Sequence, residues 1–204
     1  SIALANGLLP ANGSCTLSVN VTSALGGTWP NTTTGVSSLQ SGAAGQPSNT
    51  AVLTVIGPPT ISKSFFPTSV RTSSPSTLSI VVTNPNAVAL TAVGFTDTYP
   101  AGLPSGSLVN STPSNVQSSC TAGSSAGTLT ASNGGGSLAM SGGSLAAGGS
   151  CTITANVQST SQATFNNVTG TVSGSAGAVS LTGGTAAASL VVANRLTVAK
   201  AFTP

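Results

Sequence analysis

The fold of this chain is decided by residues 77–104, which read TLSIVVTNPNAVALTAVGFTDTYPAGLP. Every second position is apolar before the NPN sequence at 84–86 and again after it, at Leu78, Ile80, Val82, Val93 and Phe95. Alternation with a period of two is typical of a β-strand with one buried face. Asn and Pro favour turns, so this stretch predicts two strands separated by a turn.

The same pattern continues through the rest of the chain. One predicted strand face carries Cys151, Ile153, Ala155 and Val157, and an earlier one carries Cys15, Leu17, Val19 and Val21. Gly- and Pro-rich turns interrupt the chain throughout, and no helical periodicity extends beyond two turns. Many short strands at this spacing predict an all-β fold of tandem immunoglobulin-like antiparallel β-sandwich domains.

Much of the sequence is written twice. SIALANGLLPANGSCTLSVNVTS (1–23) aligns without a gap with SLAMSGGSLAAGGSCTITANVQS (137–159), and ISKSFFP (61–67) aligns with VAKAFTP (198–204). The period is long enough for each unit to be a whole domain. We expect 1–56 to be the C-terminal part of one repeat, 57–193 a complete repeat and 194–204 the first strand of the next. The chain would then be an excerpt from a longer tandem polymer.

The charge content excludes most kinds of functional site. The chain has four Lys or Arg, one acidic residue and no His, so charged residues make up 2% against about 25% in a typical domain. Paired carboxylates and Ser–His–Asp or Cys–His arrangements are impossible. The chain lacks the carboxylates and the His and Cys clusters that calcium or zinc sites need. A net charge of +3 over 204 residues is too small to form a basic surface for nucleic acid. We expect no enzyme activity, cofactor, metal or nucleic-acid partner.

Apolar content nevertheless permits a folded core. Hydrophobic residues make up 39% of the chain but aromatic residues only 3%, so Val, Leu, Ile and Ala must fill that core. With so few charges, the surface must consist of hydroxyls, amides and backbone, which suits a protein that is assembled or glycosylated. No run of 18 apolar residues exists to span a membrane, and we expect any signal peptide to lie upstream.

Two segments resemble a known family. PTISKSFFPTSV (59–70) and the following 77–104, with its T-N-P and T-D-T-Y-P-A-G-L sequences, resemble the bacterial cell-surface family of tandem Ig-like repeats. The GSCTIT sequence at 149–154 is similar to the branch of that family with paired cysteines. The resemblance covers nearly all of 57–204. It implies an exported tandem array with roles in surface architecture and adhesion, and no catalytic residues.

Lys63 and Asp97 follow the apolar parity of their strands. Lys63 alternates with Ile61 and Phe65, and Asp97 with Val93 and Phe95. One interpretation is a partly buried Lys63–Asp97 ion pair, or a lysine that reaches the domain edge. The alternative is a spontaneous Lys–Asn isopeptide cross-link in which Asp97 shuttles protons. That cross-link needs an equivalent Asn in each unit.

The alignment of the two copies provides no equivalent Asn for position 49, which disfavours the cross-link. Asn49 lies in the last predicted strand of the first copy, but it aligns with Ala186 in the second copy.

The three cysteines have no metal-binding spacing. Cys120 and Cys151 both fall in the complete unit, and Cys15 is the aligned copy of Cys151. We predict a Cys120–Cys151 disulfide, with the partner of Cys15 outside this chain. The alternative is that all three are small buried apolar residues of a reduced protein.

Five Asn residues begin N-x-S/T sequons and are candidate glycosylation sites: Asn12, Asn20, Asn31, Asn110 and Asn167. Two aromatic residues, Trp29 and Tyr99, could form a sugar-stacking platform, but core positions are favoured because Trp29 aligns with Phe165.

The favoured function is structural: a module of an extracellular filament, stalk or surface fibre built from tandem Ig-like repeats. Its partners would be copies of itself, head to tail or within one longer polypeptide, and the surface could carry glycans. The alternative is a ligand-binding adhesin module that recognises a glycan or a partner surface. The loops carry almost no aromatic residues, which favours the structural role.

Overall fold

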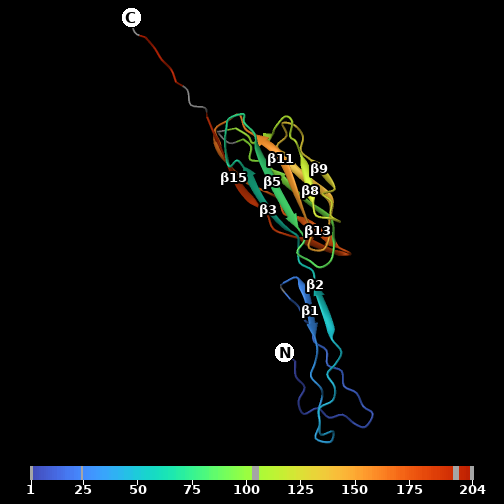
Figure 1. The fold of residues 1–204 in the computed structure, drawn as a ribbon. Coiled ribbons are helices and arrows are strands. Elements are labelled where there is room, and N and C mark those ends of the chain that lie inside the picture. The colour runs from blue at the N-terminus through green and yellow to red at the C-terminus, as the bar shows by residue number, and fades with distance from the viewer. Residues whose placement is uncertain (1, 24, 103–105, 195–197, 203–204) are drawn as a thin grey trace.

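A computed structural model describes residues 2–23, 25–102, 106–194 and 198–202, and every regular element among them is a β-strand. Strands β3 to β15 form one body, and the hairpin β1–β2 lies beyond one end of it (Figure 1). Residues 198–202 lie beyond the opposite end (Figure 1). The described part of the chain therefore contains no helix long and apolar enough to cross a bilayer.

The first sheet of the body is antiparallel and contains five strands. Strand β5 (Ser76–Thr83) lies between β3 (Thr60–Phe66) and β11 (Ser150–Gln158), and β11 also pairs with the short strands β7 (Val109–Asn110) and β8 (Gln117–Cys120). Ile80 lies directly opposite Ile153, so the apolar positions of both strands fall on one face. The alternation in the sequence predicts this face.

The second sheet has the order β14–β13–β6–β10–β9. Its strands are β6 (Leu90–Thr98), β9 (Thr128–Thr130), β10 (Ser137–Leu145), β13 (Ser173–Ala176) and β14 (Val179–Thr182). A register shift between Met140 and Gly143 interrupts the pairing of β10 with β6. A Cβ at Gly94 would lie 2.7 Å from the Met140 carbonyl oxygen, so the close approach of the two strands requires glycine here.

A third sheet completes the body with the order β12–β15–β4. Strand β15 (Ala187–Ala193) pairs antiparallel with β12 (Ala163–Val168) and parallel with β4 (Ser69–Arg71), and it lies beside β3 (Figure 1). The Gly170 N–H donates to the Thr96 carbonyl at 2.8 Å, which joins the chain just after β12 to β6.

The three sheets share one core, which makes the body an Ig-like β-sandwich. Alternate residues of β5, β6, β10, β11, β12 and β15 are buried and contact one another in a single cluster. Among its largest fully buried side chains are Phe165, Leu78, Ile80, Leu138, Ile153 and Leu190. The predicted fold class is confirmed, including a core built mainly from aliphatic side chains.

The hairpin of β1 (Gly27–Asn31) and β2 (Ala51–Val55) repeats part of this body. Trp29 lies opposite Leu53 in the hairpin, and their aligned copies Phe165 and Leu190 lie opposite each other in β12–β15. The two copies of the sequence therefore pair the same strands in the same register. The boundaries predicted for the repeats stay predictions, although all of the buried core residues fall within 57–193.

Two expectations for the first copy are wrong. No described residue before Pro59 is buried, and residues 15–21 form no strand although their copy at 151–157 lies in β11. Trp29 is 45% exposed, whereas its copy Phe165 is fully buried. The reason is pairing: β11 lies between β5 and β8 and faces a second layer, and residues 15–21 have no such neighbours among the described residues.

The predicted Cys120–Cys151 disulfide is present in the structure. Cys120 on β8 lies directly opposite Cys151 on β11, and Cys151 is fully buried at the edge of the core. Cys15 is free and exposed. The bond closes a loop of 31 residues, so it restricts the unfolded chain as well as joining two strands.

Loss of this bond should destabilise the sandwich. For Cys120→Ser with Cys151→Ser we expect the free energy of unfolding to fall by roughly 3–4 kcal/mol, as measured by urea denaturation. Cys15→Ser is the matched control because it removes a thiol that joins nothing, and it should leave the urea midpoint unchanged. A double variant as stable as the parent chain would contradict this account of the bond.

Candidate functional site

A buried polar cluster joins the three sheets of the body. Lys63 on β3 donates a hydrogen bond from Nζ to Asp97 Oδ1 on β6 at 2.7 Å. Asn167 on β12 donates from Nδ2 to the other carboxylate oxygen, Asp97 Oδ2, at 3.1 Å. The Asp97 carboxyl group therefore accepts hydrogen bonds from the amine of Lys63 on β3 and from the carboxamide of Asn167 on β12.

Strand alternation brings these three side chains into the core. Lys63 shares its strand face with Ile61 and Phe65. Asp97 lies two residues after Phe95 on the buried face of β6, and Asn167 lies two residues after Phe165 on the buried face of β12. The side chains of Lys63 and Asp97 are both 0% exposed, and Asn167 is 1% exposed. The ion-pair interpretation of Lys63 and Asp97 matches this geometry, and the pair is completely rather than partly buried.

Burial changes the acid–base properties of this pair. It raises the pKa of the Asp97 carboxyl, although the hydrogen bond and charge of Lys63 and the hydrogen bond from Asn167 oppose the change. It lowers the pKa of the Lys63 amine, against the hydrogen bond and charge of Asp97. In both groups desolvation is the larger effect, so burial makes transfer of the proton from the amine to the carboxyl easier than it is in water.

Sequence reasoning missed Asn167 as a member of this cluster. Asn31 aligns with Asn167 at the same offset that aligns Trp29 with Phe165, so each copy carries an Asn at this position. That alignment was the available signal. Asn49 is not the relevant residue, because the amide comes from β12 and not from the last strand of the unit.

The structure rules out two of the five candidate glycosylation sites in the folded protein. Asn110 is fully buried, where it accepts a hydrogen bond from the Tyr99 hydroxyl and donates to the Ser132 and Ser137 carbonyls. Asn167 is buried in the cluster described above. A glycan needs a solvent-exposed amide, so glycosylation at Asn110 and Asn167 is wrong.

The other three sequon asparagines, Asn12, Asn20 and Asn31, are exposed, and their glycosylation stays a prediction. Tyr99 is 3% exposed and belongs to the core, as favoured from the sequence. It cannot form a sugar-stacking platform with Trp29.

The joint between the hairpin and the sandwich is held by two buried asparagines of the NPN turn. Gly57 donates its N–H to Asn86 Oδ1 at 2.8 Å, and Asn86 Nδ2 donates to the Gly57 carbonyl at 2.9 Å. Asn84 in turn accepts from the Asn86 amide groups and donates to three carbonyls, of Val88, Leu145 and Ala146. The Gly-Pro-Pro linker is thus hydrogen-bonded to the domain that follows it.

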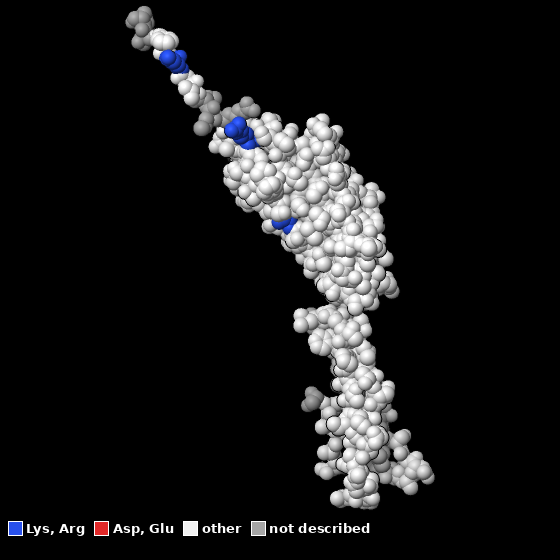
Figure 2. Space-filling view, viewed as in Figure 1, with Lys and Arg blue, Asp and Glu red and all other residues white. Residues whose placement is uncertain are grey.

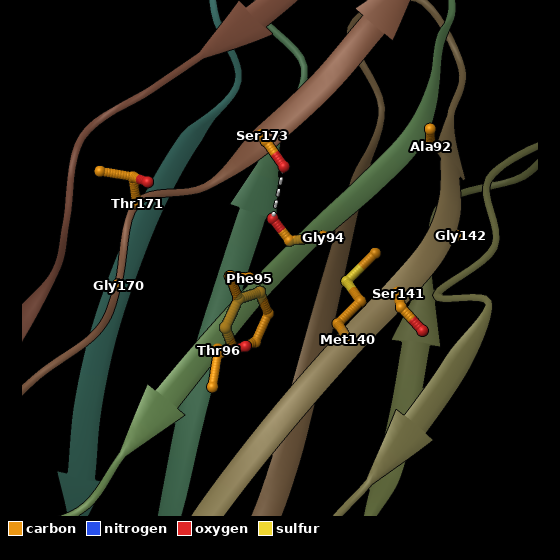
Figure 3. A pocket seen from close by; sticks show the side chains of 10 residues that line it. All are labelled: Ala92, Gly94, Phe95, Thr96, Met140, Ser141, Gly142, Gly170, Thr171 and Ser173. Atoms are coloured by element: carbon orange, nitrogen blue, oxygen red, sulfur yellow. Dashed lines mark hydrogen bonds between the residues drawn. The ribbon is translucent and has the colours of Figure 1, made fainter.

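The surface offers little chemistry. An open depression of about 440 Å³ lies over β6 and β10 and is lined by Gly94, Phe95, Met140, Ser141 and Ser173 among others, none of them titratable (Figure 3). On the face in Figure 2, Lys and Arg atoms lie at only a few places and no acidic atom is visible. Within the described residues, no three His, Cys, Asp or Glu gather as a metal site would require.

Removing one member of the ion pair should be costly. In Asp97→Ala the Lys63 amine stays buried without a counter-charge, and we expect the free energy of unfolding to fall by about 3–5 kcal/mol. In Lys63→Met with Asp97→Leu both charges are gone, so this double variant should be more stable than Asp97→Ala. Urea denaturation measures both. A double variant less stable than the single one would contradict the buried-charge account.

The sandwich is similar to several solved structures. A cohesin module from a Clostridium perfringens family 33 glycoside hydrolase matches with a TM-score of 0.47 and 11% identity, over 70% of this chain and 100% of that one. The major pilin subunit of Bacillus cereus matches with a TM-score of 0.42 and 12% identity, over 78% and 47%. Collagen adhesin from S. aureus matches with a TM-score of 0.39 and 13% identity, over 73% and 54%.

No curated protein is significantly similar in sequence. One family covers nearly the whole sandwich, from Pro59 to Val192, and it is described as a domain of unknown function, DUF7933. Because this match covers more than half of the sequence, the chain belongs to the DUF7933 family.

Proposed function

We propose that this chain is a structural module of an extracellular filament, stalk or surface fibre built from tandem Ig-like repeats. The observation that carries the proposal is the repeated strand pairing. Trp29 opposite Leu53 in β1–β2 has the same register as Phe165 opposite Leu190 in β12–β15. The β1–β2 hairpin thus has the strand pairing of β12–β15, which supports tandem repeats whose partners are copies of the same module.

The joint supports a stiff array. The Asn86 side chain donates to and accepts from the backbone of Gly57, which is the hydrogen-bond pattern of a strand partner. Two prolines follow, and each fixes its φ angle. A linker that is short, proline-rich and bonded to the next domain transmits orientation from one repeat to the next.

The chemistry of the described residues supports a non-catalytic role outside the cell. The one acidic side chain is buried against Lys63, and the depression over β6 and β10 has no titratable residue. A disulfide that crosses neighbouring strands persists in an oxidising compartment. We therefore propose an exported protein without enzyme activity.

The native assembly gives the test of this function. Antibodies raised against residues 57–193 should label thin surface fibres at many positions along their length in electron micrographs, because every repeat presents related epitopes. A chain purified alone should show no saturable binding to glycans or matrix proteins at micromolar concentrations. Label confined to fibre tips, or saturable binding to a glycan, would favour the adhesin function instead.

The stiffness of the joint can be tested separately. Asn86→Ala removes both hydrogen bonds to Gly57, so we expect residues 27–55 to tumble more independently of residues 60–193. Backbone ¹⁵N relaxation measures this change. Asn133→Ala is the matched control, because Asn133 also bonds a backbone amide, that of Ser114, but away from the joint. Equal relaxation in the parent chain and Asn86→Ala would show that Asn86 does not hold the linker.

A further inference from the structure

We propose that Lys63 and Asn167 become joined by an intramolecular isopeptide bond, between Lys63 Nζ and Asn167 Cγ, which the chain forms by itself with Asp97 moving the protons. The first support is geometric. Both nitrogen atoms contact the same carboxyl group, Nζ at 2.7 Å from Oδ1 and Nδ2 at 3.1 Å from Oδ2. The amine and the carboxamide are therefore neighbours around one acid, fixed by three different strands.

The second support is the chemistry of a sealed site. An amine attacks a carbonyl carbon only when it is neutral, and the Lys63 and Asp97 side chains are 0% exposed. Burial lowers the pKa of the Lys63 amine and raises the pKa of the Asp97 carboxyl, and both changes favour transfer of the proton from lysine to aspartate. A bulk-solvent lysine would hold that proton at neutral pH.

The third support is an unpaired atom. Asn167 Oδ1 is buried and has no hydrogen-bond partner, which is a costly state for an amide oxygen. An Asp97 carboxyl that has taken the lysine proton is a donor within the same cluster. Such a donor can stabilise the negative charge that develops on Oδ1 when the amine attacks Cγ.

The reaction balances without any other reactant. The Lys63 proton passes to Asp97, the Nζ lone pair forms a bond to Asn167 Cγ, and Oδ1 takes up the charge with the help of the Asp97 proton. Asp97 then carries a second proton from Nζ to Nδ2, the Cγ–Nδ2 bond breaks, and ammonia leaves. One amide is exchanged for another. Asp97 takes back the Oδ1 proton when the carbonyl re-forms and ends as a protonated carboxyl, because neutral ammonia leaves without the proton that Lys63 first gave up.

The repeat keeps both ends of the proposed bond. Lys200 aligns with Lys63, and Asn31 aligns with Asn167. The bond would tie β3 to β12 and close a loop of roughly 100 residues, far longer than the loop of the disulfide. This inference stands apart from the proposed function, because a cross-linked sandwich is detectable whether or not the chain forms fibres.

Intact mass of the full chain, denatured and reduced, tests the proposal. We expect a mass about 17 Da below that of the sequence, the loss of one ammonia. Lys63→Arg keeps a buried cation but removes the nucleophilic amine, and Asn167→Ala removes the carboxamide, so both should have their full calculated masses. Asn166→Ala is the matched control, because Asn166 is exposed on the same strand, and it should keep the deficit.

A tryptic digest identifies the bond itself. With a free Lys63, trypsin releases 1–63, 64–71 and 72–195, whereas an amidated Lys63 is not cleaved and 1–71 stays joined to 72–195. This distinction matters because an Asn–Gly pair such as Asn133–Gly134 can also lose ammonia by cyclising. A deficit that persists in Lys63→Arg would therefore overturn the proposal.

Thermal unfolding provides a second readout. We expect Lys63→Arg and Asn167→Ala to unfold at temperatures lower than the parent chain by roughly 10 °C or more, since both lose the long loop closure. A parent chain that is folded by circular dichroism and has the full calculated mass would overturn the proposal outright, whatever the stability of the variants.

Discussion

The burial of Lys63 against Asp97 is the constraint on which the rest of this fold depends. The chain has only five charged residues, and the side chains of two of them are buried against each other in a sandwich whose core is mainly Val, Leu, Ile, Ala and Phe. Removing an amine and a carboxylate from water is costly unless each is paired and hydrogen-bonded. Strands β3, β6 and β12 must therefore hold their positions within hydrogen-bond distance. Sliding any of them by one residue would turn Lys63, Asp97 or Asn167 to the wrong face.

One disulfide and two buried asparagines also fix elements of the fold relative to one another. The disulfide joins β8 to β11 at the edge of the first sheet, Asn110 binds the Tyr99 hydroxyl and two carbonyls beside the second, and Asn86 fixes the incoming linker. All three are polar or covalent ties rather than aromatic packing. A chain with 3% aromatic residues gains less from burying side chains, so specific ties contribute more to its stability.

Sequence alone predicted the features that depend on local alternation and on counting. The faces of β5 and β11, the inward parity of Lys63 and Asp97, and the pairing of Cys120 with Cys151 all followed from spacing within one unit. A period of two identifies a buried face without knowledge of the partner strand. The strand faces are local features, whereas the cysteine pairing followed from there being only two cysteines in the complete unit. The structure agrees with both.

Features that depend on partners from distant sequence could not be predicted in this way. Residues 15–21 alternate as 151–157 do, yet they form no strand, because a strand needs neighbours as well as a pattern. Asn110 and Asn167 have the N-x-S/T sequence of a glycosylation site, but tertiary packing buries both side chains. The place of Asn167 beside Asp97 depends on how β12 passes β6, although the alignment of Asn31 with Asn167 marked the position.

A crystal structure of residues 57–193 at a resolution that separates single atoms would test the central claim most directly. The account predicts that the Asp97 carboxyl lies buried between Lys63 and Asn167, with electron density continuous from Lys63 Nζ to Asn167 Cγ. Lys63 extended into solvent, with the Asp97 carboxyl bonded elsewhere, would contradict the claim that this buried cluster holds the three sheets together.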